Sequence, residues 1–172
     1  MHRTVAVIIT TVTCLVFSNA VAAAATTTVN DPDDVSSRLD VRNVSIAPIQ
    51  GGEMARITVT FWNGVPARML HRNPIQVDLG VDRHVAYDQA IFRNAAGRLR
   101  IVWGEAGSNC CFVNPATHPD RFTYTATFPN LLEAEPPPNS FRGWSSRKVD
   151  CDRLACYLFE GRILDRTAWV DI

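Results

Sequence analysis

The chain has 172 residues, of which 17 are basic and 17 are acidic, so its formal net charge is zero. This balance excludes the strongly basic surface that binding to nucleic acid or to an anionic membrane requires. The length suits one domain with a single hydrophobic core.

Residues 1–25 have the three parts of a secretory signal peptide. Arg3 gives a positive start, Val5–Phe17 is an apolar run too short to be a permanent membrane span, and Ala20–Ala25 supplies the small residues that signal peptidase needs. The sequence therefore predicts a signal helix, cleavage between Ala20 and Ala25, and a secreted, extracellular protein. A retained N-terminal anchor is the alternative. After cleavage we expect no membrane insertion, because no later apolar run approaches about 20 residues.

A polar, acidic N-terminal tail is predicted over residues 26–36, before a single domain over residues 37–172. In and just after it lie four carboxylates, those of Asp31, Asp33, Asp34 and Asp40. Hard cations bind through several oxygens at short range, so these residues are the candidate ligands of a structural Ca²⁺ ion. The alternative is that they cap a turn and charge the edge of the first strand.

The domain shows apolar residues at every second position, which is typical of β-strands with one buried face. One example is Ala55–Phe61, and Asn94–Gly97 is a plausible hairpin turn between two later strands. Single helical turns are expected at Ala67–His71 and Asn130–Glu135. We expect eight or nine strands in an all-β, two-sheet antiparallel sandwich, jelly-roll-like or immunoglobulin-like. The expected core contains Ile57, Val59, Phe61, Val77, Leu79, Phe122, Tyr124 and Phe128.

Four cysteines follow the signal segment: Cys110, Cys111, Cys151 and Cys156. In an exported protein they are expected to form two disulfide bonds. Adjacent side chains in an extended segment point to opposite faces, which favours bonding each of Cys110 and Cys111 to one of the other two. Bonds within the two close pairs, and a zinc site made by all four, are the alternatives.

Three tryptophans are candidate ligand-binding residues: Trp62, Trp103 and Trp144. Each lies near a strand end or on the polar side of an alternation, most clearly Trp62, and an exposed ring there could stack on a sugar ring. The alternative is that they fill space in the packed sheets.

A second polar cluster contains Asp78, Asp82, His84 and Asp88. An acid–base pair or further calcium ligands are conceivable there. The simpler interpretation is that these residues face solvent, alternating with the apolar residues of the neighbouring strand.

Several segments carry a resemblance to known sandwich families. The acidic entry Asp31–Val35, the strand Ile57–Thr60, and Phe122–Pro129 followed by Phe141–Trp144 resemble secreted actinobacterial β-sandwich proteins of unassigned function. The layout over residues 30–148 is also distantly similar to DOMON-type and family-9 carbohydrate-binding sandwiches. The resemblance implies a sandwich fold, and relatives of these types hold haem, a sugar or a structural calcium ion. The haem pattern of a methionine with a histidine has no matching position here.

No catalytic residue is predicted, because the sequence has neither a Gly-x-Ser-x-Gly nucleophile turn nor a Gly-rich phosphate loop. We therefore expect a secreted, non-catalytic module. Its expected partner is a cell-surface glycan or protein, and not nucleic acid. A small secreted hydrolase and a purely structural cell-envelope protein are the alternatives.

Overall fold

The computed structural model describes residues 25–105, 112–129, 138–147 and 162–171. The predicted signal helix, all four cysteines after it, and the expected helical turn at Asn130–Glu135 lie outside these ranges. Their predicted structures and disulfide bonds therefore stay predictions.

The described residues form eleven β-strands and no α-helix. Their bounds are β1 Thr27–Asn30, β2 Val41–Ile49, β3 Met54–Phe61, β4 Ile75–Val81, β5 His84–Arg93, β6 Leu99–Glu105, β7 Phe112–Asp120, β8 Thr123–Pro129, β9 Ser140–Arg147, β10 Arg162–Arg166 and β11 Val170–Asp171. Two short 3₁₀-helices, η1 (Gln50–Gly52) and η2 (Ala67–His71), lie in connections, and η2 matches a predicted helical turn.

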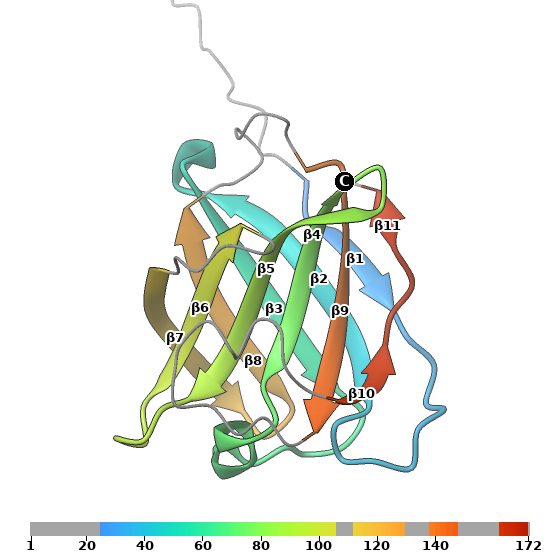
Figure 1. Ribbon diagram of the computed structural model, residues 1–172, viewed down its shortest axis with the longest axis vertical. Helices are drawn as coiled ribbons and strands as arrows, with labels where there is room; N and C mark the ends of the chain where they lie inside the picture. The colour runs from blue at the N-terminus through green and yellow to red at the C-terminus, as the bar shows by residue number, and fades with distance from the viewer. Residues whose placement is uncertain (1–24, 106–111, 130–137, 148–161, 172) are drawn as a thin grey trace, which may run out of the picture.

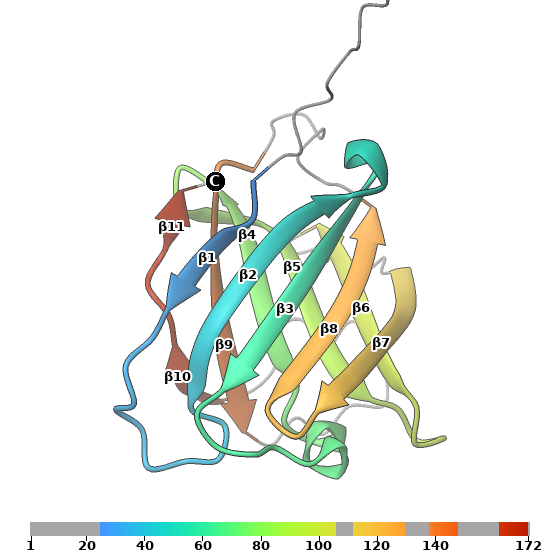
Figure 2. The same ribbon diagram turned by 180° about the vertical axis from the view of Figure 1, so that it is seen from behind.

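All strand pairs are antiparallel, and hydrogen bonds follow one path, β1-β2-β3-β8-β7-β6-β5-β4-β9-β10, while β11 pairs with β9. The sheet is curled into a half-barrel, with β4, β5, β6 and β9 on the side nearer the viewer in Figure 1 and β2, β3 and β8 nearer in Figure 2. The all-β, antiparallel prediction is confirmed. The finer arrangement, a sandwich of two separate sheets, is not shown.

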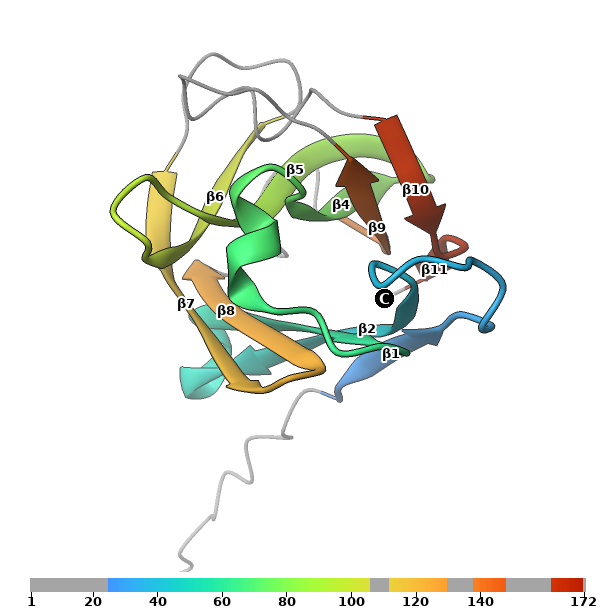
Figure 3. The same cartoon turned by 90° about the horizontal axis from the view of Figure 1, so that it is seen from below.

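Strand β7 makes the sheet continuous. Its first residues, Phe112–Pro115, pair with β6, and its later residues pair with β8. Seen end-on, β7 links β6 to β8 at the bend of the half-barrel (Figure 3). Because β7 pairs with a strand of each half, the hydrogen-bonded sheet continues from one half to the other.

The core lies on the concave face of the curled sheet. In β3 the residues at every second position, Ala55 to Phe61, are buried, as the alternation predicts. Of the eight expected core residues, Ile57, Val59, Phe61, Val77, Leu79, Tyr124 and Phe128 are buried. Phe122 is only half-buried, because it lies in the turn before β8.

The half-barrel is open along one line, between the β1–β2 pair and the β9–β10 pair, and we call this line the seam. Among the described strands none pairs across it. Instead, the Val41 amide donates a 2.6 Å hydrogen bond to Asp165 Oδ2, and Ser145 Oγ donates a 2.7 Å bond to the Leu39 carbonyl. Val44 packs so closely against Gly143 that a Cβ atom at Gly143 would clash with it. Isolated side-chain contacts therefore replace a β-ladder at the seam.

Candidate functional site

Four aspartates converge at one end of the seam. Asp31 and Asp34 lie between β1 and β2, Asp40 directly precedes β2, and Asp165 belongs to β10. One carboxylate oxygen from each lies within 4.8 Å of the others. We call these residues the seam aspartates.

Sequence reasoning proposed three of the seam aspartates and missed the fourth. Asp31, Asp34 and Asp40 come together as expected, whereas the exposed Asp33 is not one of the four. Asp165 could not be placed from the pattern, because it is contributed by a distant strand. The available signal was weak: a single acidic residue after the apolar pair Ile163–Leu164, near the end of the sequence.

Local backbone structure turns the Asp31–Asp40 segment back on itself. The Asp31 amide donates to the Arg42 carbonyl at 2.9 Å, and Trp62 Nε1 donates to the Asp31 carbonyl at 3.2 Å. The Trp62 amide donates to the Asp40 carbonyl at 3.0 Å, and the Val35 amide donates to Asp40 Oδ2 at 3.2 Å. These bonds fix the loop against the end of β3 and hold the Asp40 carboxylate inside it.

A register shift brings Asp165 to the same place. The pairing of β10 with β9 is irregular between Ile163 and Asp165. A bulge of this kind re-aims the side chain that follows it. Asp165 is buried at the seam, where its Oδ2 accepts the Val41 amide.

Burial and the nearby carboxylates raise the pKa values of three of the seam aspartates, Asp31, Asp40 and Asp165. Burial, with Asp165 and Asp34 nearby, raises the pKa of Asp31 to about 6. Burial also raises the pKa of Asp40 to about 6, although the Val35 amide acts against this rise. The pKa of Asp165 is raised, chiefly by burial. In the described part of the chain, no arginine or lysine forms an ion pair with any of them.

Asp40 gives a second, independent observation that favours a cation among these carboxylates. Its side chain is fully buried, and its Oδ1 atom has no hydrogen-bond partner. A buried, unpaired carboxylate oxygen is costly unless something compensates it. A cation bound among the four carboxylates would do so.

The geometry fits a hard cation of the size of Ca²⁺. Ca²⁺ binds oxygens at about 2.3–2.6 Å, so two ligands on opposite sides of the ion lie roughly 4.6–5.2 Å apart. The four carboxylate oxygens lie within 4.8 Å of one another, which is compatible with this spacing. Four carboxylates are also a ligand set typical of Ca²⁺, whereas Mg²⁺ usually binds one or two carboxylates and keeps several waters. Asp34 is exposed, which leaves a side open for water ligands.

The three tryptophans predicted to bind a ligand do not form one surface. Trp62 is exposed and carries the Arg42 guanidinium 5.0 Å from its ring centroid. Trp103 pairs with Gln89 across the concave face and stacks on Phe112 at 4.5 Å. Trp144 is on the opposite face, where its Nε1 donates to Asp78 at 2.9 Å. These three tryptophans therefore do not form a common surface on which a sugar could stack.

The second polar cluster separates into an exposed and a buried pair. Asp82 and His84 are exposed at the β4–β5 hairpin. Asp78 and Asp88 are paired across β4 and β5 and are buried, so the prediction that they face solvent is wrong. Arg142 Nε donates to Asp78 at 2.7 Å, and burial together with Asp78 raises the pKa of Asp88 to about 7. This network links β4, β5 and β9.

In comparisons with known proteins, no family model, no curated protein and no solved structure matches this chain. The resemblance to DOMON-type and family-9 carbohydrate-binding sandwiches therefore stays a prediction. Within the described ranges, no helix has the length and apolar character needed to cross a membrane.

Proposed function

We propose that the protein is a secreted, non-catalytic extracellular binding module, and that a Ca²⁺ ion bound by the seam aspartates holds its sheet closed. The observation that supports this most strongly is the convergence of four carboxylates, one of them fully buried. Among the described residues, no arginine or lysine forms an ion pair with them. The two halves of the curled sheet would serve as the two layers of the expected sandwich. A cell-surface glycan or protein is the proposed partner.

The ion would act as a bond between two parts of the chain that no β-ladder joins. Asp31, Asp34 and Asp40 belong to the β1–β2 side of the seam, and Asp165 belongs to the β9–β10 side. Without a cation, four carboxylates repel one another across the seam. With it, the same charges draw the two sides together.

A small secreted hydrolase is the second candidate, and the Asp78–Asp88 pair is the observation that favours it. Asp88 keeps its proton near neutral pH, while Asp78 accepts hydrogen bonds from Arg142 and Trp144. Both carboxyl groups are buried, however, and a general acid must reach its substrate. We therefore assign this pair to packing of the sheet.

The proposal is tested by thermal unfolding of the purified protein in EDTA and in Ca²⁺. A ligand at about 100 times its dissociation constant stabilises the native state by about 2.7 kcal/mol. For a domain of this size, that corresponds to a rise in Tm of roughly 5–10 °C. The variant Asp165→Asn should lose the rise. In EDTA it should be at least as stable as the wild type, because one repelling charge has gone.

The matched control is Asp171→Asn, which removes an exposed carboxylate that forms an ion pair with Arg83 at 3.4 Å, away from the seam aspartates. It should keep the full calcium response. A wild-type Tm that is the same in EDTA and in Ca²⁺ would show that the seam aspartates hold no ion.

A further inference from the structure

The convex face of the sheet carries a row of hydroxyl side chains in register. Across five neighbouring strands, β1, β2, β3, β8 and β7, the paired residues are Thr28, Ser45, Thr58, Thr125 and Thr117. All five are at least partly exposed. Neighbouring strands lie about 4.8 Å apart, so the row presents hydroxyl groups at a regular spacing.

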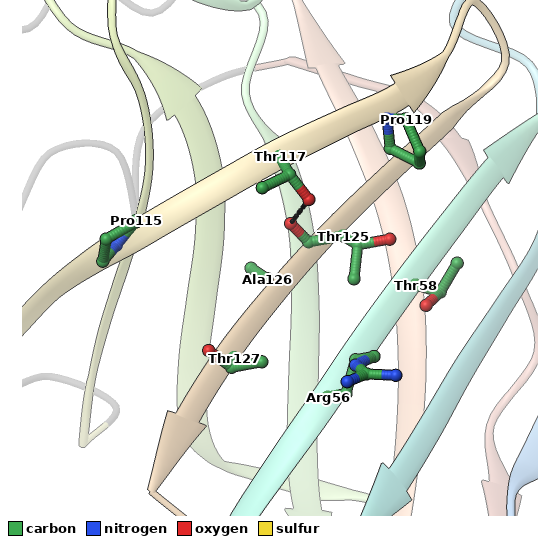
Figure 4. Close-up of a pocket in the computed structure, with 8 residues that line it drawn as sticks. All are labelled: Arg56, Thr58, Pro115, Thr117, Pro119, Thr125, Ala126 and Thr127. Carbon is green, nitrogen blue, oxygen red and sulfur yellow. Dashed lines mark hydrogen bonds between the residues drawn. The ribbon is translucent and has the colours of Figure 1, made fainter.

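Part of this face is hollowed into an open groove over β3, β8 and β7, with a volume of about 500 Å³ (Figure 4). This volume lies within the range of about 300–1,000 Å³ that is usual for ligand sites. Threonines line much of the groove, and Thr117 Oγ1 donates a 3.4 Å bond to the Thr125 carbonyl.

The β7 side of the groove is irregular. Pro115 and Pro119 of β7 line the groove, and neither has an amide hydrogen to donate to a ladder. The pairing of β7 with β8 has a register shift between Thr117 and Asp120, the stretch that contains Pro119. One wall of the groove is therefore a strand with an interrupted ladder.

One of the side chains that line the groove is positively charged, that of Arg56. Arg56 is exposed on the same face as Thr58 and Thr127 (Figure 4). Its side chain makes no ion pair or hydrogen bond with the described residues. The outward positions of β3 and of its neighbours β2 and β8, such as Thr58, Ser45 and Thr127, carry no acidic residue within the described ranges. The guanidinium fork is thus available to an external anion.

We propose that this groove binds an acidic polysaccharide, a polyhydroxylated chain that carries carboxylates. An arginine matches a carboxylate with two parallel hydrogen bonds. Threonine hydroxyls both donate and accept, as sugar hydroxyls do. The groove offers both chemistries side by side, and the other outward positions of β3 and β8 carry no charged residue.

This inference supplies the ligand class of the proposed binding module and rests on that function. It uses none of the seam aspartates, so the two proposals can fail separately. Calcium binding is measured by Tm, and glycan binding is measured in EDTA.

The test is isothermal titration of the full purified chain with polygalacturonate oligosaccharides in EDTA. EDTA prevents Ca²⁺ from bridging the polyuronate to the protein. Neutral dextran oligosaccharides and dextran sulfate form the comparison arms. We expect binding of the polyuronate and no binding of neutral dextran. Binding of dextran sulfate alone would overturn the carboxylate assignment.

Two sets of variants identify the groove. Arg56→Gln should weaken polyuronate binding at least tenfold, and Arg56→Lys should weaken it less, because the charge remains but the fork is lost. The double variant Thr58→Val/Thr125→Val should also weaken binding, although it keeps the side-chain shape. The matched controls are Thr60→Val, which changes an outward residue of β3 that does not line the groove, and Arg98→Gln, which removes another exposed arginine.

Each variant is checked for an unchanged Tm and an unchanged calcium response, so that a loss of binding reports the groove and not the fold. Unchanged affinity in Arg56→Gln, or equal losses in the control variants, would overturn the proposal. Absence of polyuronate binding by the wild type, in the presence of a normal calcium response, would overturn the ligand class while leaving the calcium proposal intact.

Discussion

Two buried carboxyl groups on one face of the sheet are treated differently by their surroundings. Asp78 accepts hydrogen bonds from Arg142 Nε at 2.7 Å and from Trp144 Nε1 at 2.9 Å. Asp88 is its partner on β5, and burial together with the neighbouring Asp78 raises the pKa of Asp88 from 3.8 to about 7. The pair can therefore keep one proton at neutral pH, and this proton affects stability.

The Asp88 proton predicts a fall in stability as pH rises. An acid with a raised pKa in the native state binds more protons than the unfolded chain between the two pKa values, so its contribution is present at low pH and lost above about pH 7. Between about pH 5 and about pH 8, the free energy of unfolding of the wild type should fall by on the order of 2 kcal/mol more than that of Asp88→Asn. Urea unfolding in EDTA at both pH values measures this difference. An equal fall in both proteins would contradict it.

A single glycine sets the spacing across the seam. Gly143 of β9 faces Val44 of β2 with no room for a Cβ atom. Gly143→Ala should lower the free energy of unfolding by about 1–3 kcal/mol, the usual cost of overpacking. Gly64→Ala is the control, because its nearest neighbour is the flexible Arg121 side chain at 3.4 Å. Chemical denaturation measures both. Adding Val44→Ala should recover part of the loss, and strictly additive effects would show that the two residues are not in contact.

At the scale of strands, the sequence predicts positions best for strands that have one buried face and one solvent-exposed face. The alternation in β3, and the left-handed Gly97 in the turn between β5 and β6, appear where the pattern places them. The strand β7 was missed, because Pro115 and Pro119 interrupt the expected period. The strand β1 lies in the segment assigned to a polar tail, since only Val29 of its residues is buried. Edge and corner strands bury little and so carry a weak signal.

The candidate metal site follows the same rule. Asp31, Asp34 and Asp40 are close in sequence, and their composition alone suggests a cation site. Asp165 joins them only through the register of β10 and the curl of the whole sheet. No local pattern contains that information. For the same reason, the three tryptophans looked equivalent in sequence but lie on different faces.

At the scale of the whole molecule, continuous β-ladders join the strands along the path of the sheet, whereas isolated contacts join its two edges at the seam. Seven antiparallel strands separate β2 from β10 along the path of hydrogen bonds, whereas isolated contacts close the direct route between them. The stability of the molecule is thus expected to be uneven.

Hydrogen exchange should reveal this unevenness. Adding EDTA to the calcium-loaded protein should speed exchange of the Val41 amide, which is bonded to Asp165, and of other amides of β1 and β10. Amides that pair β3 with β8 should change little. In Asp165→Asn the exchange pattern should not respond to EDTA. A uniform response throughout the sheet would indicate that the ion acts on global stability and not on the seam.

The position of Asp165 also bears on how the molecule matures. Val41 and the aspartate that binds its amide are 124 positions apart. A chain still emerging from the ribosome, or one truncated before β10, has three of the four carboxylates and lacks Asp165, which binds the Val41 amide across the seam. If the seam aspartates bind Ca²⁺ as proposed, the complete ligand set forms only after β10 has joined the sheet, so ion binding would distinguish the folded chain from a fragment that lacks β10.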